Sequence, residues 1–154
     1  MTDHVALGRL PHLVIPDTDI FSLRRAVACN PQSDPKVAAL TFLASELDRA
    51  EIVKSDELPW NVVTMHASAE YRDDVTNDVG RLKLIHPDEE QWDGTCISVL
   101  SPLGAAVLGL SEGHSIRWRT PSGGIRGVTI LHVLFQPYWK KPNWYGWQTD
   151  SALL

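Results

Sequence analysis

The pattern of hydrophobic and polar positions begins with an amphipathic stretch over residues 17–28. Its apolar positions recur at spacings of three and four, which predicts a helix with one apolar stripe: Ile20, Leu23 and Val27. Asp17 or Thr18 can cap its start, because a short polar side chain accepts hydrogen bonds from the first free N–H groups. Asn30-Pro31 ends the helix, since the residue before a proline resists the helical conformation.

A second amphipathic stretch follows, and its start is marked more clearly. Asp34 suits the N-cap, and Pro35 suits the first helical position, where its missing N–H costs nothing. Its apolar positions alternate as in a short coiled-coil seam: Leu40, Leu43, Leu47 and Ala50. Residues 17–54 therefore predict a short antiparallel helical hairpin, with helices of roughly 13–20 residues and a length of about 20–30 Å.

After residue 54 the period changes from helical to extended. Five stretches carry β-branched residues or alternate between apolar and polar positions: 61–72, 79–86, 96–100, 114–120 and 125–135. Ser101-Pro102 starts a short helix of small apolar residues, and Ser122-Gly123-Gly124 closes a β-hairpin between the last two strands. The predicted fold class is α+β, an N-terminal helical hairpin followed by an antiparallel sheet with one short helix.

Composition narrows the class of protein. The chain has 154 residues, of which 44% are hydrophobic, enough for one core. It has no run of 18 apolar residues and no basic segment leading into an apolar one, so we expect neither a membrane span nor a signal peptide. Cys29 and Cys96 are far apart and form no disulfide framework, which favours a cytoplasmic protein. The net charge of −5 argues against direct nucleic-acid binding by phosphate neutralisation and favours a protein partner.

Residue spacing offers little catalytic chemistry. The histidines have no metal-ligand spacing: His4, His12, His66, His86, His114 and His132. The glycines at 123 and 124 lie between two strands and do not open a helix, unlike a phosphate-binding loop, and the chain has no GxSxG motif. We therefore expect no catalytic residues, no metal and no cofactor.

The last segment is unusually aromatic, with Tyr138, Trp139, Trp144, Tyr145 and Trp147. Two interpretations stay open for it. The aromatic side chains fold back over an open face of the sheet, or they form a binding interface, in which Trp139, Trp144 and Trp147 are the candidate residues.

Residues 99–133, VLSPLGAAVLGLSEGHSIRWRTPSGGIRGVTILHV, resemble the C-terminal domain of the Gre transcript-cleavage factors. Two departures are the extra Ser122 and His114, which stands where that family usually has an acid. Residues 46–73, ELDRAEIVKSDELPWNVVTMHASAEYRD, are similar to the Rnk branch of the family, the regulators of nucleoside diphosphate kinase. The resemblance covers about residues 14–137. It implies an FKBP-like β domain over 55–137, preceded by a hairpin segment over 1–54 and followed by a tail over 138–154.

The resemblance also implies a partner and a mode of action. Gre-type factors bind bacterial RNA polymerase at the rim of its secondary channel, and the matching contact residues here are Ser101, Pro102 and Leu103. Gre factors carry acids at the tip of a long coiled coil, where they help to hold a catalytic Mg²⁺. The tip here contains Asn30, Gln32, Ser33 and Asp34, with a single acid. The expectation is a factor that competes with Gre proteins for the channel entrance without stimulating cleavage.

Two alternatives remain at this stage. The branch name allows a regulator that acts directly on, or through, nucleoside diphosphate kinase. The FKBP-like fold allows a prolyl isomerase, although fold alone does not carry activity and that reaction needs an aromatic-lined pocket on the sheet.

Overall fold

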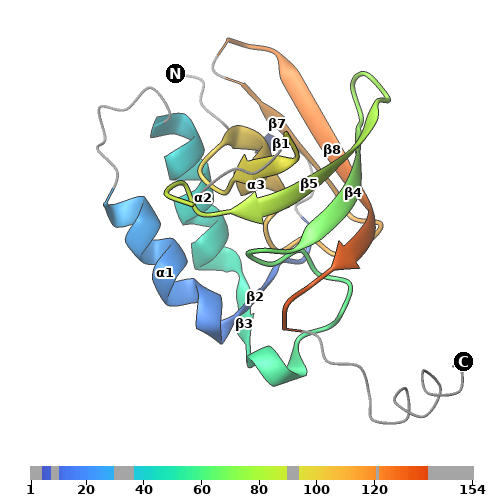
Figure 1. Cartoon of the computed structure of the whole chain (residues 1–154). Helices are drawn as coiled ribbons and strands as arrows, with labels where there is room; N and C mark the ends of the chain where they lie inside the picture. Colours follow the sequence, from blue (N-terminus) through green and yellow to red (C-terminus); the bar gives the residue numbers. More distant parts are fainter. Residues whose placement is uncertain (1–4, 8–10, 30–36, 90–93, 121, 139–154) are drawn as a thin grey trace, which may run out of the picture.

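A computed structural model describes residues 5–7, 11–29, 37–89, 94–120 and 122–138 (Figure 1). Side chains are described for 11–29, 40–89, 94–120 and 122–138. The helices are α1 (Asp17–Ala28), α2 (Val37–Arg49) and α3 (Pro102–Val107), with a 3₁₀ turn at Ser55–Glu57. The strands are β1 (Val5–Leu7), β2 (Val14–Pro16), β3 (Glu51–Val53), β4 (Ser68–Asp73), β5 (Val79–Ile85), β6 (Cys96–Ser98), β7 (Ser115–Arg119) and β8 (Ile125–Phe135).

The main sheet is mixed, with strand order β1-β7-β8-β4-β5-β6. All its neighbours are antiparallel except β5 and β6, which run parallel. The prediction of a wholly antiparallel sheet is therefore wrong at this edge. A tight turn cannot join parallel neighbours, and here residues 86–95 separate β5 from β6 along the chain, so that Cys96 pairs with Lys83. A separate two-stranded parallel pair, β2 and β3, frames the helical hairpin.

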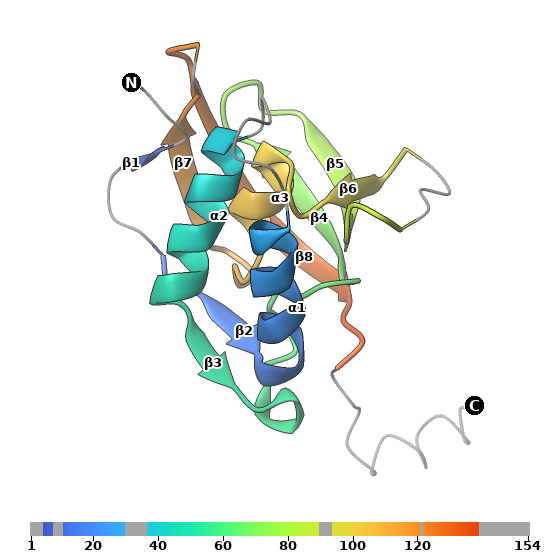
Figure 2. The same ribbon diagram turned by 90° about the vertical axis from the view of Figure 1, so that its left-hand side faces the viewer.

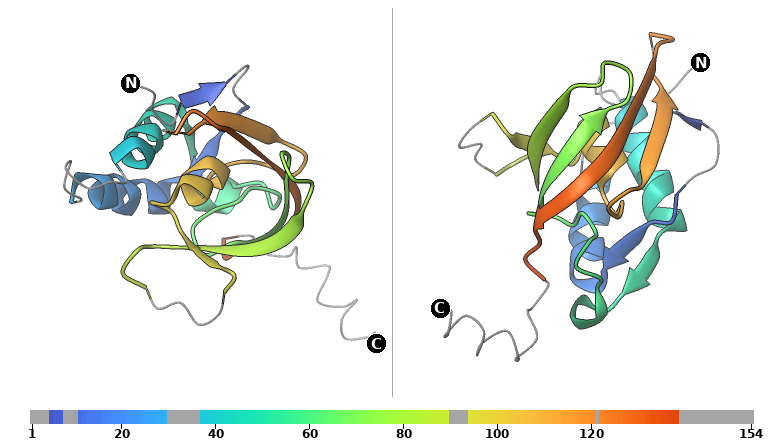
Figure 3. Two further views of the ribbon diagram at one scale, coloured as in Figure 1. Left: turned by 90° about the horizontal axis from the view of Figure 1, so that it is seen from above. Right: turned by 90° about the vertical axis from the view of Figure 1, so that its right-hand side faces the viewer.

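The two long helices lie side by side on one face of the molecule, and α2 contacts both α1 and α3 (Figure 2). Seen from above, the main sheet curls around α3 (Figure 3, left). The seam residues Leu23, Leu43 and Leu47 are buried in the same hydrophobic cluster as Trp118 and Ile130 of the sheet. The apolar stripe predicted for the hairpin is confirmed, and it packs into the core of the sheet as well as between the helices.

The start of α1 differs from the prediction. Pro16 occupies the N-cap, and no side chain caps the helix. Asp17 and Asp19 both lie in the first turn, where carboxylates suit the free N–H groups of the helix. Asp17 instead accepts a hydrogen bond from the backbone N–H of Ser55, 3.2 Å away. The predicted cap Asp34 and its neighbour Pro35 lie outside the described residues.

The predicted strand over 61–72 begins only at Ser68, because the backbone of Asn61 to Val63 bonds to the irregular segment 109–112 and His66 interrupts the extended path. Val63 donates to the carbonyl of Leu110 at 2.9 Å and accepts from Gly109 at 2.8 Å. His66 has a φ of 67°, outside the strand region. These residues are nevertheless largely buried, which explains why their β-branched, apolar composition looked like a strand.

Three further predictions are confirmed by the structure. The helix after Ser101 begins at Pro102, and β7 and β8 form an antiparallel hairpin. Gly123, with a φ of 94°, supplies the left-handed residue that its turn needs. No helix in the described part of the chain is long and apolar enough to cross a membrane.

Candidate functional site: the start of α3 and the cleft beside α1

Ser101 holds the start of α3 through its own hydroxyl group. Its Oγ accepts a hydrogen bond from the backbone N–H of Gly104 at 3.1 Å and donates one to the carbonyl of Ser98 at 2.7 Å. Its backbone is extended, as at an N-cap, and Pro102 occupies the first turn. Both partners of the hydroxyl lie three residues away, so this helix start is satisfied locally.

The small residues after Pro102 are required by close packing. A Cβ atom at Gly104 would lie 2.0 Å from the Ser98 carbonyl oxygen, a distance that real atoms do not adopt. The side of the helix from Gly104 to Val107 is buried. This contact explains why so short a helix has a strong N-cap. The cap fixes the start of a helix that must pack directly on the end of β6.

The predicted contact residues differ in exposure. Pro102 is exposed, while Ser101 and Leu103 are half-buried. The structure thus brings these three together as a surface whose backbone is rigid and whose apolar atoms are partly accessible. A surface of this kind can be recognised by a partner without first being reordered.

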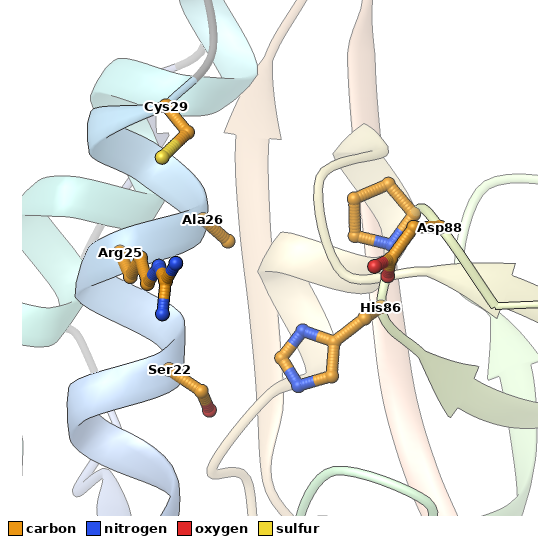
Figure 4. A pocket seen from close by; sticks show the side chains of 7 residues that line it. Ser22, Arg25, Ala26, Cys29, His86 and Asp88 are labelled. Atoms are coloured by element: carbon orange, nitrogen blue, oxygen red, sulfur yellow. The ribbon is translucent and has the colours of Figure 1, made fainter.

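A cleft of about 500 Å³ separates α1 from the residues that follow β5 (Figure 4). One face of α1 lines it with Ser22, Arg25, Ala26 and Cys29, and the other wall consists of His86, Pro87 and Asp88. The His86 ring extends toward α1. The Ser22 hydroxyl donates to the backbone carbonyl of Asp19 at 3.0 Å, so in the described part of the chain it is not paired with a base as a nucleophile would be.

A polar cluster next to this cleft joins segments far apart in the sequence. The Asp19 carboxylate, in a residue only 4% exposed, accepts hydrogen bonds from the Met65 N–H at 3.3 Å and from the Tyr138 hydroxyl. Burial raises the pKa of Asp19, and these two hydrogen bonds oppose that shift. Burial and the neighbouring Asp19 carboxylate both raise the pKa of Tyr138.

Glu89 organises the other half of the cluster. Its carboxylate lies 2.8 Å from Nε2 of His66 and accepts the backbone N–H of His86 at 2.6 Å. Burial favours the neutral acid, but these partners outweigh it and lower the pKa of Glu89. The rings of His66 and His86 meet edge to face, with centroids 6.0 Å apart.

Sequence reasoning missed both the cleft and the polar cluster. Their residues come from α1, the irregular segment before β4, the loop after β5 and the end of β8, and no spacing along the chain links them. The side chains of the described residues form no cluster that could hold a metal ion. The predicted tip residues Asn30, Gln32, Ser33 and Asp34, and the tail residues Trp139, Trp144 and Trp147, lie outside the described residues.

Comparison with known proteins identifies the family of this chain. Residues 58–135, half of the chain, match the family described as "Transcription elongation factor, GreA/GreB, C-term". The chain belongs to the GreA/GreB family. The matched region of this family member contains α3 and the strands from β4 to β8, and therefore the whole surface formed by Ser101, Pro102 and Leu103.

Individual relatives agree with this assignment. The regulator of nucleoside diphosphate kinase from Escherichia coli (strain K12) is 37% identical over 95 residues, which cover 62% of this chain and 70% of the relative. Transcription elongation factor GreA from Nitratidesulfovibrio vulgaris is 31% identical over 99 residues, covering 64% of this chain and 61% of that protein.

A solved structure extends the likeness beyond the C-terminal region. The prokaryotic transcription elongation factor GreA/GreB from Nitrosomonas europaea is 33% identical, with a TM-score of 0.63, and the match covers 82% of this chain and 100% of that one. Since 82% exceeds the matched half of the chain, the similarity in shape includes residues outside 58–135.

Proposed function

We propose that this protein regulates transcription by binding RNA polymerase at the entrance of the secondary channel, through the start of α3. In this proposal Pro102 and Leu103 contact the polymerase and Ser101 holds them in place. The protein competes there with Gre-type factors and does not stimulate transcript cleavage.

The observation that carries the proposal is the combination of family membership with a locally capped, accessible helix start. The helix start lies within the region that matches the GreA/GreB C-terminal family. Ser101, Gly104 and the Ser98 carbonyl fix its backbone, and the exposed Pro102 presents it to solvent. A preformed contact surface lowers the entropy cost of association.

The absence of cleavage in this proposal rests on the hairpin. The described parts of its helices are 12 and 13 residues long, which corresponds to about 18–20 Å. They pack against α3 and the core of the sheet. The sequence that joins them, residues 29–36, contains one acid, Asp34. A pair of carboxylates that reaches a distant Mg²⁺ is not available in such a connection.

The test is competition for core RNA polymerase between this protein and a Gre factor, followed by a cleavage assay on stalled complexes. Pro102→Glu is the informative variant, because an acid in the first turn of a helix is tolerated while the apolar contact is lost. Ile52→Glu, at an exposed position of β3, is the matched control for the added charge. We expect displacement of the Gre factor by the wild type and by Ile52→Glu, weaker displacement by Pro102→Glu, and no cleavage. Transcript cleavage, or equal displacement by both variants, would contradict the proposal.

A second candidate function is favoured by the relatives named regulators of nucleoside diphosphate kinase. In that case the partner is the kinase itself. Binding of the purified protein to purified kinase, in the absence of polymerase, tests it directly. Kinase binding together with no polymerase binding would replace the first proposal by the second. The isomerase alternative gains no support from the cleft beside α1, since none of its lining residues is Phe, Tyr or Trp.

A further inference from the structure

The outer face of the main sheet gathers basic side chains in an acidic protein. Along β4, β5 and β7 the inward positions are buried or pack on the core, as at Ala69, Leu82 and Trp118. Because successive side chains of a strand point to opposite faces, the alternate positions point outward. The outward positions include five cations: Arg72, Arg81, Lys83, Arg117 and Arg119. We call these five the basic face.

Most of the basic face is unneutralised. Arg72 forms an ion pair with Asp74 at 2.8 Å, whereas the other four cations form no ion pair with any described residue. The only other outward acid on these three strands is Glu70, opposite Arg81 on the neighbouring strand. The protein as a whole has a net charge of −5. Its charge is thus distributed unevenly, with an excess of positive charge on this surface.

No described helix covers this face. In Figure 3 (right) β4, β8 and β7 face the viewer, and the helices lie behind them. The basic face is therefore separated by the sheet from α3, and the inference below does not depend on the polymerase contact proposed for the helix start.

A hollow of about 500 Å³ lies in the basic face where Gly127 of β8 leaves out a side chain between its neighbours. A Cβ atom at Gly127 would lie 3.0 Å from Cγ of Arg117 and 3.4 Å from Cβ of Asp74. Arg117 and Gly127 are direct neighbours across β7 and β8. The side-chain stem of Arg117 therefore lies close over Gly127, and both residues line the hollow.

Hydrogen bonds inside the hollow leave it with positive character. Asp74 accepts from Nε of Arg72 at 2.8 Å with one oxygen and from the Thr129 hydroxyl at 2.7 Å with the other. Since the single proton of Thr129 goes to Asp74, the Ser115 hydroxyl donates to Thr129 across their 2.6 Å contact. Each oxygen of the carboxylate thus already accepts one hydrogen bond, and the Arg117 guanidinium remains as a charged donor for an incoming group.

We propose that the basic face docks an acidic segment of a partner protein, and that the hollow at Gly127 receives one of its carboxylates against Arg117. A protein is favoured over a nucleic acid by the acids that lie among the cations. Glu70 and Asp74, spaced among the cations, repel a continuous phosphate backbone but accommodate separate carboxylates.

The test uses a fluorescein-labelled oligoglutamate peptide as the probe and labelled oligothymidylate of equal charge as the comparison. Arg117→Glu removes the central cation, and Gly127→Ala begins to fill the hollow. Lys54→Glu is the matched control, because Lys54 is an exposed cation outside both hollows that forms no ion pair with a described residue. Thermal melting verifies that each variant is folded.

We expect the peptide to bind with an affinity that falls as salt rises, and Arg117→Glu to weaken it about tenfold. Gly127→Ala weakens it less, and Lys54→Glu leaves it unchanged. Amide shifts in an NMR titration then fall on β4, β7 and β8. Absence of peptide binding, or equal weakening by Arg117→Glu and Lys54→Glu, would overturn the proposal. Tighter binding of oligothymidylate on the same strands would also overturn it and would identify a nucleic-acid surface.

Discussion

The starts of α1 and α3 use their polar side chains in opposite ways. A helix N-terminus carries free backbone N–H groups. At α3 the Ser101 hydroxyl accepts a hydrogen bond from one of them, and both of its partners lie three residues away. At α1 the two acids of the first turn bond to distant segments: Asp17 to Ser55, and Asp19 to Met65 and Tyr138.

This difference separates a structural helix start from one that is free for recognition. The start of α1 joins the hairpin to the sheet domain and to residue 138, so it cannot change partners without loosening the fold. The start of α3 needs nothing from the rest of the chain beyond β6, so its exposed residues remain accessible to another molecule. The following changes test this contrast, in order of expected effect.

The largest effect is expected from Gly104→Val. A Cβ atom there overlaps the Ser98 backbone, so α3 must move away from β6 and the core opens. We expect a loss of about 3 kcal/mol in the free energy of unfolding, measured by denaturant titration. Gly94→Ala is the control, because a Cβ at Gly94 meets no atom within 4 Å and should leave stability nearly unchanged.

The second-largest loss in unfolding free energy is expected from Asp19→Ala. It removes the acceptor of the buried Met65 N–H and of the Tyr138 hydroxyl, which costs about 2 kcal/mol. Asp19→Asn keeps an oxygen acceptor and removes the buried charge, so its loss should be smaller. If both variants unfolded at the denaturant concentration of the wild type, Asp19 would not join the hairpin to the sheet as described.

The same residue predicts a pH dependence with a definite sign. The pKa of Asp19 is raised in the folded protein, so the unfolded chain loses this proton first as pH rises. The stability of the wild type relative to Asp19→Asn is therefore greatest below the ordinary pKa of 3.8 and falls as pH rises through the folded-state value. Denaturant titrations of both proteins over a pH series measure this. A relative stability that rises with pH would contradict the assignment.

Ser101→Ala should cost about 1 kcal/mol, because it removes a helix cap without opening the core. Ser101→Asn retains an oxygen for the Gly104 N–H and should recover part of the loss. The contrast with Asp19 predicts a further difference in amide hydrogen exchange. For Ser101→Ala, exchange should become faster only around α3. For Asp19→Ala, it should become faster in α1, in the segment around Met65 and at the end of β8. Spread of the Ser101→Ala effect to α1 would contradict the local character of this cap.

The smallest effect concerns Asp73, whose carboxylate bonds to its own turn and also pairs with Arg126 of β8 at 3.0 Å. It accepts hydrogen bonds from the N–H groups of Val75 at 2.9 Å and Thr76 at 3.1 Å. The Val75 bond is the main cause that lowers its pKa. Its stabilisation is present above pH 3.8 and is lost as pH falls through the lower folded-state value. Asp73→Asn should therefore reduce the loss of unfolding free energy at acid pH by about 1 kcal/mol or less. An unchanged loss at acid pH would show that the turn does not depend on this charge.

The sequence predicted those parts of the molecule that local patterns determine. The stripe through Leu23, Leu43 and Leu47, the cap at Ser101 and the hairpin turn at Gly123 each depend on residues a few positions apart. The predicted N-cap of α1 was wrong, because the side chains of Asp17 and Asp19 form hydrogen bonds to distant segments and not within their own turn. The parallel edge of β6 and the irregular path from Asn61 to Ala67 depend on tertiary contacts in the same way.

The candidate site shows the same difference between local features and features that depend on tertiary contacts. The surface of Ser101, Pro102 and Leu103 is contiguous in sequence, so a motif could reveal it. The cleft beside α1 and the basic face assemble single residues from several elements, and the hollow at Gly127 brings together residues of β7 and β8 such as Arg117 and Thr129. The division of the chain at residues 54 and 137 stays a prediction.

The central claim is that the start of α3 is the surface that RNA polymerase recognises. Its most direct test is a photo-crosslinking side chain placed at position 102 and, separately, at the exposed position 52 of β3, each mixed with core polymerase. The account predicts a crosslink from position 102 that an excess of Gre factor abolishes, and none from position 52. A crosslink from position 52 alone, or one from position 102 that survives excess Gre factor, would contradict it.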